Sequence, residues 1–414
     1  MLEKLKQLYR NYFFFFPLLI ALLLPFGINY GIFIILWFIC FFAFGDVKSG
    51  MQRVLTNKWF YIFFVFFLWH AIGYFFSVNK EEALSGIEIK LPFLFFPLLI
   101  FSHHFKNLDI RKIVISFVSG CFIASSFCLF RAFYLFYSEH INSFFYSDFT
   151  YFLHPSYFAM YLIFAQLIVI LYYKKWLAHL KNLNFKIGFI SIIFISCIFL
   201  ASSKMGLIVG LIVLPSTLFV ILYQMGKKKI IASVIFILIL VVSLSYKLFP
   251  TPFERLKKAF EVTTSSQTID LSDAESTAVR ILIWKESIEI IKGHFFVGTT
   301  VGDAKDALFQ SYQKKGITGA IAKKLNAHNQ YLQTFIGTGL FGFILLVLMT
   351  VGIIIYGFIK KNFLLSLFGI VLTLNFLVES MLQAQAGFIF FTFFICLLLD
   401  NNLNKITNNL NFSR

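Results

Sequence analysis

Runs of apolar residues recur along this chain of 414 residues, and most of them are long enough to cross a lipid bilayer. A membrane-spanning helix needs about 20 mostly apolar residues, and runs near that length alternate here with short polar breaks. The pattern therefore predicts an all-α polytopic membrane protein with about twelve spanning helices. The expected spans are residues 12–28, 31–45, 59–76, 87–101, 110–137, 151–173, 187–201, 205–223, 230–247, 329–359, 363–379 and 384–399.

Two of these spans depend on breaks within the apolar pattern. The run 87–101 is short and contains Pro92 and Pro97, so we expect a broken or tilted helix there. The run 187–223 is too long for one span, and its only polar break is Ser202–Lys204. We expect two helices joined by a tight hairpin at that break.

One long polar segment interrupts the apolar pattern. The expected organisation is helices 1–9 in residues 1–247, a large outer loop in 248–327, helices 10–12 in 328–399 and a cytoplasmic tail in 400–414. The loop should contain a helix of its own, because Ser272 and Glu275 form a capping signal and Gly293 provides a stop. Its predicted apolar face, placed on the membrane surface or over the bundle, consists of Ile281, Trp284, Ile288 and Ile291.

The distribution of charge predicts how the chain is oriented. The net charge of +17 would indicate nucleic-acid binding in a soluble protein, but 59% of the residues are hydrophobic and the basic residues gather in alternate short segments. Basic segments favour the cytoplasmic side of a membrane. Both termini are therefore expected in the cytoplasm and the long loop outside, with no nucleic-acid partner. The basic segments hold Lys4, Lys6 and Arg10, Lys48, Arg53 and Lys58, Lys106, Arg111 and Lys112, Lys174, Lys175, Lys181 and Lys186, Lys227–Lys229, Lys360 and Lys361, and Lys405 and Arg414, whereas the short outer segments hold only Lys80, Lys90 and Lys204.

Several kinds of chemistry have no motif in the sequence. All five cysteines lie inside apolar runs, which favours small packing residues over disulfides or a zinc site. No metal-ligand cluster and no phosphate-binding glycine loop is found, so we expect neither a metal nor a cofactor. The N-terminus imitates a signal peptide, but no small-residue cleavage site follows, which favours a retained first helix.

Polar residues with chemical potential gather at the predicted outer face. Each has an ordinary explanation: an interfacial histidine, a snorkelling lysine, a helix start, a solvated arginine or a salt bridge. Taken together, two cations and a histidine beside a helix N-terminus are suited to a diphosphate substrate. The candidates are His328 and Asn329 at the start of helix 10, Arg280 in the loop, Lys204 in the hairpin, and His154, Ser156, Glu379 and Gln383 as lining residues.

Three stretches in order resemble a known family. They are the lone basic residue in the short hairpin, VRILIWKESIEIIKGHFFVGTTVGD in the long loop, and HNQYLQTFIGTGLFG at the start of the next helix. This arrangement, specific over residues 201–342, is similar to the O-antigen ligase and polymerase superfamily of bacterial envelope enzymes. The last stretch carries Gly337, Gly339 and Gly342, which would let neighbouring helices approach closely.

The resemblance implies a function and a location. It implies a glycosyltransferase in the bacterial inner membrane whose periplasmic face transfers a glycan from undecaprenyl diphosphate, without metal or nucleotide. By position, His328 would be the essential histidine and Arg280 would grip the diphosphate. Lys204 departs from the arginine usual in that hairpin, so the charge is kept but not the bidentate fork. Gly298 and Gly302 fit the family's turn after the loop helix.

Several functions stay open from the sequence. We favour the ligase type, which attaches finished O-polysaccharide to a lipid A-core sugar. The alternatives within the family are a polymerase that extends lipid-linked repeat units and an enzyme that glycosylates proteins. A transporter or flippase of lipid-linked oligosaccharide is the alternative from another class. A transporter should show paired halves and polar residues near the bilayer midplane, whereas the polar residues here gather on one face.

Overall fold

The computed structural model describes residues 2–28, 30–103, 105, 107–178, 180–227, 230–235, 271–272 and 277–399, with the single positions 240, 243, 246, 247 and 253. Within that part, every regular element is a helix. The first half contains α1 (Leu2–Tyr12), α2 (Phe15–Leu23), η1 (Leu24–Phe26), α3 (Gly31–Phe44), α4 (Val47–Thr56), α5 (Lys58–Phe76), α6 (Lys80–Lys90), α7 (Pro92–Ser102), α8 (Asn107–Glu139), α9 (Tyr146–Phe149), α10 (Pro155–Ile168), η2 (Val169–Tyr173) and α11 (Lys174–Trp176). The second half contains α12 (Leu183–Leu200), α13 (Lys204–Gln224), α16 (Thr277–Gly293), α17 (Ala304–Lys315), α18 (Thr318–Ala322), α19 (Gln330–Val347), η3 (Leu348–Gly352), α20 (Ile353–Ile359), α21 (Phe363–Phe376), η4 (Met381–Gln383) and α22 (Gln385–Leu399).

The expected polytopic membrane architecture is confirmed in outline. Among the described residues, seven helices are long and apolar enough to cross a membrane, or up to nine if each bent pair is one span. Two shorter apolar helices, α21 and α22, follow. The expected hairpin break is also present, because α12 ends at Leu200 and α13 begins at Lys204. Most of the expected span 230–247 lies outside the described residues, so the total of twelve stays a prediction.

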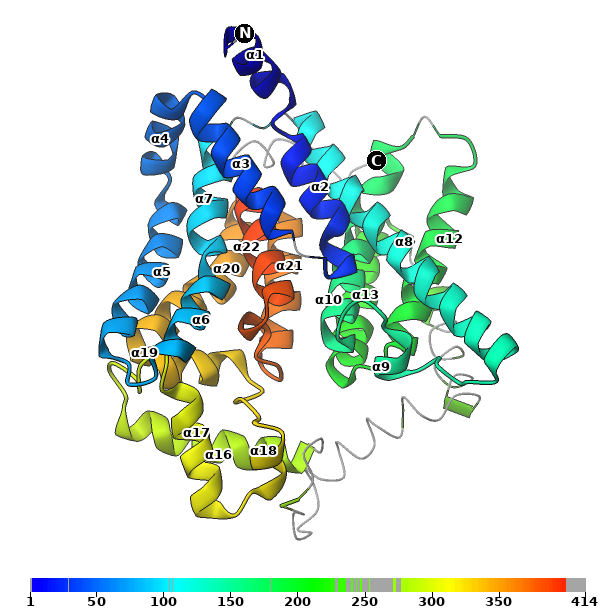
Figure 1. The fold of residues 1–414 in the computed structure, drawn as a ribbon. Helices are drawn as coiled ribbons and strands as arrows, with labels where there is room; N and C mark the ends of the chain where they lie inside the picture. The colour runs from blue at the N-terminus through cyan, green and yellow to red at the C-terminus, as the bar shows by residue number, and fades with distance from the viewer. Residues whose placement is uncertain are drawn as a thin grey trace.

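The two ends of the bundle differ in character. The helix α1 lies at one end, and α16, α17 and α18 gather at the other (Figure 1). At the α1 end the chain makes two bends, of 46° between α1 and α2 and of 117° between α3 and α4. The hydropathy pattern predicts a loop at residues 47–56, but the structure has a short amphipathic helix there. Asp46 starts that helix, because its carboxylate accepts from the Ser49 amide.

The fourth predicted span is longer than its apolar run. The prediction of 87–101 is wrong at its start, since α6 and α7 together form one apolar segment of 23 residues, Lys80–Ser102. The helix begins early because Asn79 accepts a hydrogen bond from the Glu82 amide and caps it. Lys90 is therefore not a loop residue. It lies buried in this segment and donates to the Gly86 carbonyl, 3.2 Å away.

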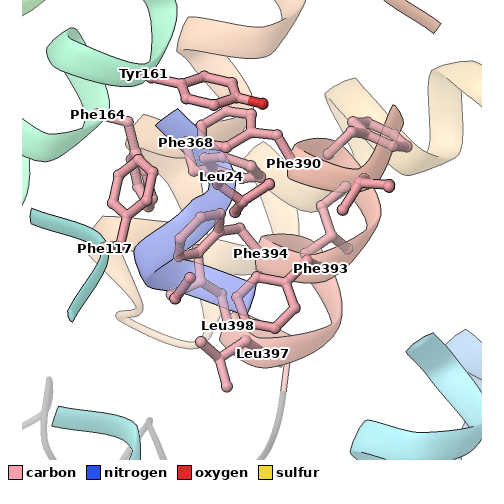
Figure 2. Close-up of a cluster of buried hydrophobic side chains, with 14 of the residues drawn as sticks. Leu24, Phe117, Tyr161, Phe164, Phe368, Phe390, Phe393, Phe394, Leu397 and Leu398 are labelled. Carbon is pink, nitrogen blue, oxygen red and sulfur yellow. The ribbon is translucent and has the colours of Figure 1, made fainter. Parts of the chain in front are cut away.

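The core of the bundle is built largely from phenylalanine. Figure 2 shows Phe390 and Phe394 of α22 packed against side chains of α8, α10 and α21. Every residue of α10 from Phe158 to Ile168 is buried, as is every residue of α22 from Gly387 to Leu399. The helices α10 and α22 are therefore central. Because α10 is packed on all sides, the residues at its start have a defined position at the end of the bundle where α16 lies.

The described part of the long loop, residues 277–327, folds into a small helical layer with its own core. Val279 and Ile283 of α16 are fully buried there, together with Leu308 and Tyr312 of α17. The predicted apolar face of α16 was partly wrong. Ile291 is buried as expected, but Ile288 is 45% exposed. The buried stripe is rotated because α16 packs between α17 and α19.

The carboxylate of Asp303 ties this layer to the transmembrane bundle. It accepts hydrogen bonds from the Val78 and Asn79 amides between α5 and α6, at 2.8–3.1 Å, and from the Thr300 hydroxyl at 2.7 Å. Burial raises the pKa of Asp303, but these hydrogen bonds and nearby Lys80 lower it more, so the pKa lies below its ordinary value. An ion pair between Lys305 and Glu82 adds a second tie.

A kink in α19 receives the turn that follows α16. Gly339 has φ +65° inside the helix, and Gly298 in the turn has φ +79°. The Leu340 amide donates to the Phe295 carbonyl at 2.9 Å, and the Thr299 amide donates to the Ile336 carbonyl at 2.7 Å. The loop backbone thus replaces helical hydrogen bonds at the kink. The glycines were expected to let neighbouring helices approach, but the segment that approaches Gly339 is the turn after α16.

Gly339→Ala should therefore destabilise the protein. A Cβ at this position would lie 2.2 Å from the Phe296 carbonyl oxygen and would adopt a left-handed conformation. The expected cost is about 2 kcal/mol or more, measured as a lower unfolding temperature in detergent. Gly337→Ala is the matched control, because its Cβ would meet nothing closer than 3.5 Å. Equal unfolding temperatures for the two variants would contradict this account of the kink.

Candidate active site at the outer end of the bundle

Glu379 lies at the centre of the candidate site, on the segment that connects α21 to η4. Its side chain is 15% exposed. One carboxylate oxygen, Oε1, accepts a hydrogen bond from His328 Nδ1 at 3.2 Å, and the other, Oε2, lies 3.6 Å from Arg280 Nη2. The carboxylate thus joins the two residues that the sequence analysis ranked first. Glu379 was expected only as a lining residue at a helix mouth.

The backbone at the start of α19 holds His328 in place. His328 has φ +43°, an uncommon conformation for a residue other than glycine, and its amide donates to Asn326 Oδ1 at 2.9 Å. Asn329 caps α19 by accepting from the Tyr331 and Leu332 amides, while its Nδ2 donates to the Leu377 carbonyl. Asn329 is buried and directs its amide group at the backbone. We therefore interpret Asn329 as a positioning residue, in place of the expected contact with substrate.

Arg280 comes to the site from α16. Its Nη1 donates to the Val378 carbonyl at 3.0 Å, which places the guanidinium beside the Glu379 carboxylate. The side chain is 29% exposed, so part of the guanidinium group faces outward. Because Trp284, one turn later on α16, donates to the Ala327 carbonyl at 3.0 Å, the helix is also tied to the residue before His328.

Lys204 reaches the same region from the first turn of α13. Its Nζ donates to the Thr277 hydroxyl at 3.3 Å. Thr277 and Arg280 are three residues apart and lie on neighbouring positions of one helix face. The structure therefore ties Lys204 to the helix that carries Arg280. A contact of 3.4 Å between the hydroxyls of Ser203 and Ser156 joins α13 to the start of α10.

His154 and Ser156 complete the site from α10. His154 is exposed and caps α10, with Nδ1 accepting from the Ser156 amide at 3.4 Å. When its ring is protonated, its positive charge favours the ionised form of Glu379. Gln383, on η4, is half-buried. A residue that sequence reasoning missed is Gln330, whose Oε1 accepts from the Leu382 amide at 2.7 Å and so holds η4 against α19. The sequence signal for Gln330 was its position directly after His328 and Asn329 at the start of α19.

The charges around Glu379 decide its ionisation. Burial by itself raises the pKa of the Glu379 carboxyl. The hydrogen bond from His328 and the charges of His328, Arg280 and His154 outweigh burial, so the pKa lies below its ordinary value of 4.5. Glu379 is thus a carboxylate at neutral pH. Arg280 is the cation that pairs with this carboxylate, and Lys204 contacts Thr277 on the same helix, so positive charge is available near the site for a further anion.

The described residues offer no cluster of metal ligands. Among the described residues, no three His, Cys, Asp or Glu side chains could hold a metal ion together. The expectation of metal independence stays a prediction.

Residues 189–347 match the family model described as O-antigen ligase. The matched segment begins in α12, ends in α19 and includes Lys204, Arg280 and His328. The comparison with curated proteins finds no match.

Proposed function

We propose that this chain, a member of the O-antigen ligase and polymerase superfamily through residues 189–347, is a membrane glycosyltransferase of the ligase type. It transfers a glycan from undecaprenyl diphosphate to a lipid A-core sugar at the periplasmic face of the inner membrane. The observation that carries the proposal is the His328–Glu379–Arg280 cluster. It combines a proton acceptor with a cation in one site, and Lys204 lies nearby.

The cations act on the leaving group. When the bond between the anomeric carbon and the diphosphate oxygen breaks, negative charge develops on that oxygen. Arg280 and Lys204 are positioned to stabilise this charge, and such electrostatic stabilisation is usually the largest contribution to catalysis. The guanidinium is anchored at Val378, so it need not reorganise during the reaction.

His328 acts on the acceptor hydroxyl. Because a carboxylate only accepts hydrogen bonds, His328 Nδ1 carries the proton that is donated to Glu379. The Nε2 atom is then free of a proton and accepts the one from the attacking hydroxyl. The hydroxyl oxygen bonds to the anomeric carbon in a single displacement, and undecaprenyl diphosphate leaves. Glu379 stabilises the imidazolium that forms, as a carboxylate does in catalytic triads.

Replacing Glu379 with glutamine should show how much the negative charge of Glu379 contributes to glycan transfer. The variant keeps the shape of the side chain but loses its charge, and we expect turnover to fall about a hundredfold.

The lowered pKa of Glu379 also predicts how the stability of the protein depends on pH. The stabilisation by Glu379 is fully present above the ordinary carboxyl pKa of 4.5 and is lost as pH falls through the lower folded value. The difference in unfolding temperature between wild type and Glu379→Gln should therefore narrow on acidification from pH 7. A constant difference would contradict the assigned pKa shift.

A gene deletion in the native organism tests the proposed function. Surface glycolipid is separated on a gel, and lipid-linked glycans are extracted in parallel. A ligase predicts long chains left on undecaprenyl diphosphate and bare core on the surface, restored by the wild-type gene but not by His328→Ala. Core that bears a single repeat unit would indicate a polymerase instead. Accumulation of lipid-linked glycan facing the cytoplasm would indicate a transporter and remove the assigned roles.

A further inference from the structure

A loop that carries several aromatic side chains, most of them partly exposed, leads into α10 at the border of the site. It comprises residues 140–154 and joins α8 to α10 through the short helix α9 (Figure 1). Phe149 is fully buried and anchors the loop. The Ile141 amide donates to the Leu135 carbonyl at 3.0 Å, and Arg131 donates to the Asp148 carbonyl at 2.8 Å. The loop is therefore held to α8 along its length.

Three aromatic rings follow one another from this loop into the site. The ring centroids of Tyr146 and His154 are 6.3 Å apart at 78°, and those of His154 and Tyr157 are 6.2 Å apart at 77°. The Tyr157 hydroxyl donates to the Met381 carbonyl at 3.3 Å, two residues beyond Glu379. Tyr146 has φ +59°, which a bulky residue adopts only at an energetic cost. The loop holds this conformation, and it places the Tyr146 ring beside His154.

The chemistry of this surface differs from that of the cation pair. Because His154 Nδ1 accepts from the Ser156 amide, the neutral ring carries its proton on Nε2 as a donor. Tyrosine rings present an apolar face and a polar edge. A sugar ring has the same two properties, with C–H groups on its faces and hydroxyls around its edge. Arg280 and Lys204, by contrast, suit the diphosphate.

We propose that Tyr146, His154 and Tyr157 form a sugar-binding surface that holds a pyranose ring next to the bond being made. The inference rests on the proposed function, because that function places a glycan in front of Glu379. The ring stacks on Tyr146, and its hydroxyls exchange hydrogen bonds with His154. The sugar belongs either to the acceptor or to the first residue of the donor, since both present the same chemistry.

Binding of free glycan tests this surface without any transfer reaction. The probe is the surface glycan of the native organism, released from its lipid by mild acid, and titrated into full-length protein in nanodiscs by ligand-observed NMR. Tyr146→Asn, which removes the ring but tolerates positive φ, should weaken binding about tenfold. Tyr146→Phe should stay within about twofold of wild type. Tyr151→Asn is the matched control. Tyr151 lies on the same loop and is 59% exposed, but its ring packs against the Arg131 guanidinium instead of His154.

A transfer assay then identifies the source of the sugar. If Tyr146→Asn raises KM for the acceptor at constant KM for the lipid-linked donor, the sugar belongs to the acceptor. The reverse result assigns it to the donor, and either result supports the surface. Equal glycan affinities of Tyr146→Asn, Tyr151→Asn and wild type would overturn it. Failure of the proposed function gives a different result, because wild type would then bind glycan but transfer none.

Discussion

His328→Ala should lower the turnover of glycan transfer at least about a thousandfold, with purified donor and acceptor, and leave membrane insertion unchanged. The reason is that His328 Nε2 can accept the acceptor's proton while Nδ1 is held by Glu379. Arg280 and Lys204 would still bind the diphosphate in the variant. The loss should therefore appear in kcat, with KM for the donor little changed.

Two further variants separate the chemistry of His328 from its position. His328→Asn tolerates the positive φ of this residue and can donate to Glu379, but it cannot accept a proton, so it should be as inactive as alanine. His294→Ala is the control, because His294 is an exposed histidine at the end of α16 in the same outer layer. Activity of His328→Asn near that of His294→Ala would remove the base assignment.

Arg280→Lys should lower turnover by about a hundredfold to a thousandfold, the second-largest effect that we expect. The guanidinium contacts the Val378 carbonyl with Nη1 and Glu379 with Nη2. A lysine amine is a single point of charge and cannot keep both contacts while it also faces the leaving group. The net charge is unchanged, so electrostatic attraction of the donor to the site persists.

The comparison for Arg280→Lys needs two other substitutions. Lys292→Ala removes a positive charge from the same helix at an exposed position paired with Glu289, and it should transfer glycan at the wild-type rate. Lys204→Arg restores the residue usual in the resembling family and should keep or raise activity. Membrane insertion of all three variants is measured in parallel. Turnover of Arg280→Lys close to that of Lys292→Ala would contradict the diphosphate clamp.

Helix boundaries were predictable where apolar composition and capping residues agree. The break between α12 and α13 was expected because Ser202–Lys204 is the only polar point in a long apolar run, and Ser203 caps α13 by accepting from the Gly206 amide. The start of α6 was not expected. A polar first turn with Lys80 and Glu82 conceals a helix when only hydropathy is considered, although the Asn79 cap was a local signal.

The site was predictable as a set of residue types but not as an arrangement. His328, Arg280 and Lys204 stood out because each is a polar residue at an outer helix end, which is unusual in an apolar chain. The role of Glu379 was hidden, because its partners are 51 and 99 residues away in the sequence. The same applies to Asn329, whose cap and tie to Leu377 appear only when α19 and α21 lie side by side.

The sequence by itself predicted the membrane character, most of the spans, a resemblance to a family and the residue types of the candidate site, because hydropathy, charge and short motifs are local properties of the chain. Only the tertiary structure decided which segments meet: that Glu379 joins His328 to Arg280, that α16 packs between α17 and α19, and that the kink at Gly339 receives the turn after α16. These contacts depend on the packing of helices far apart in sequence, and no local pattern specifies that packing.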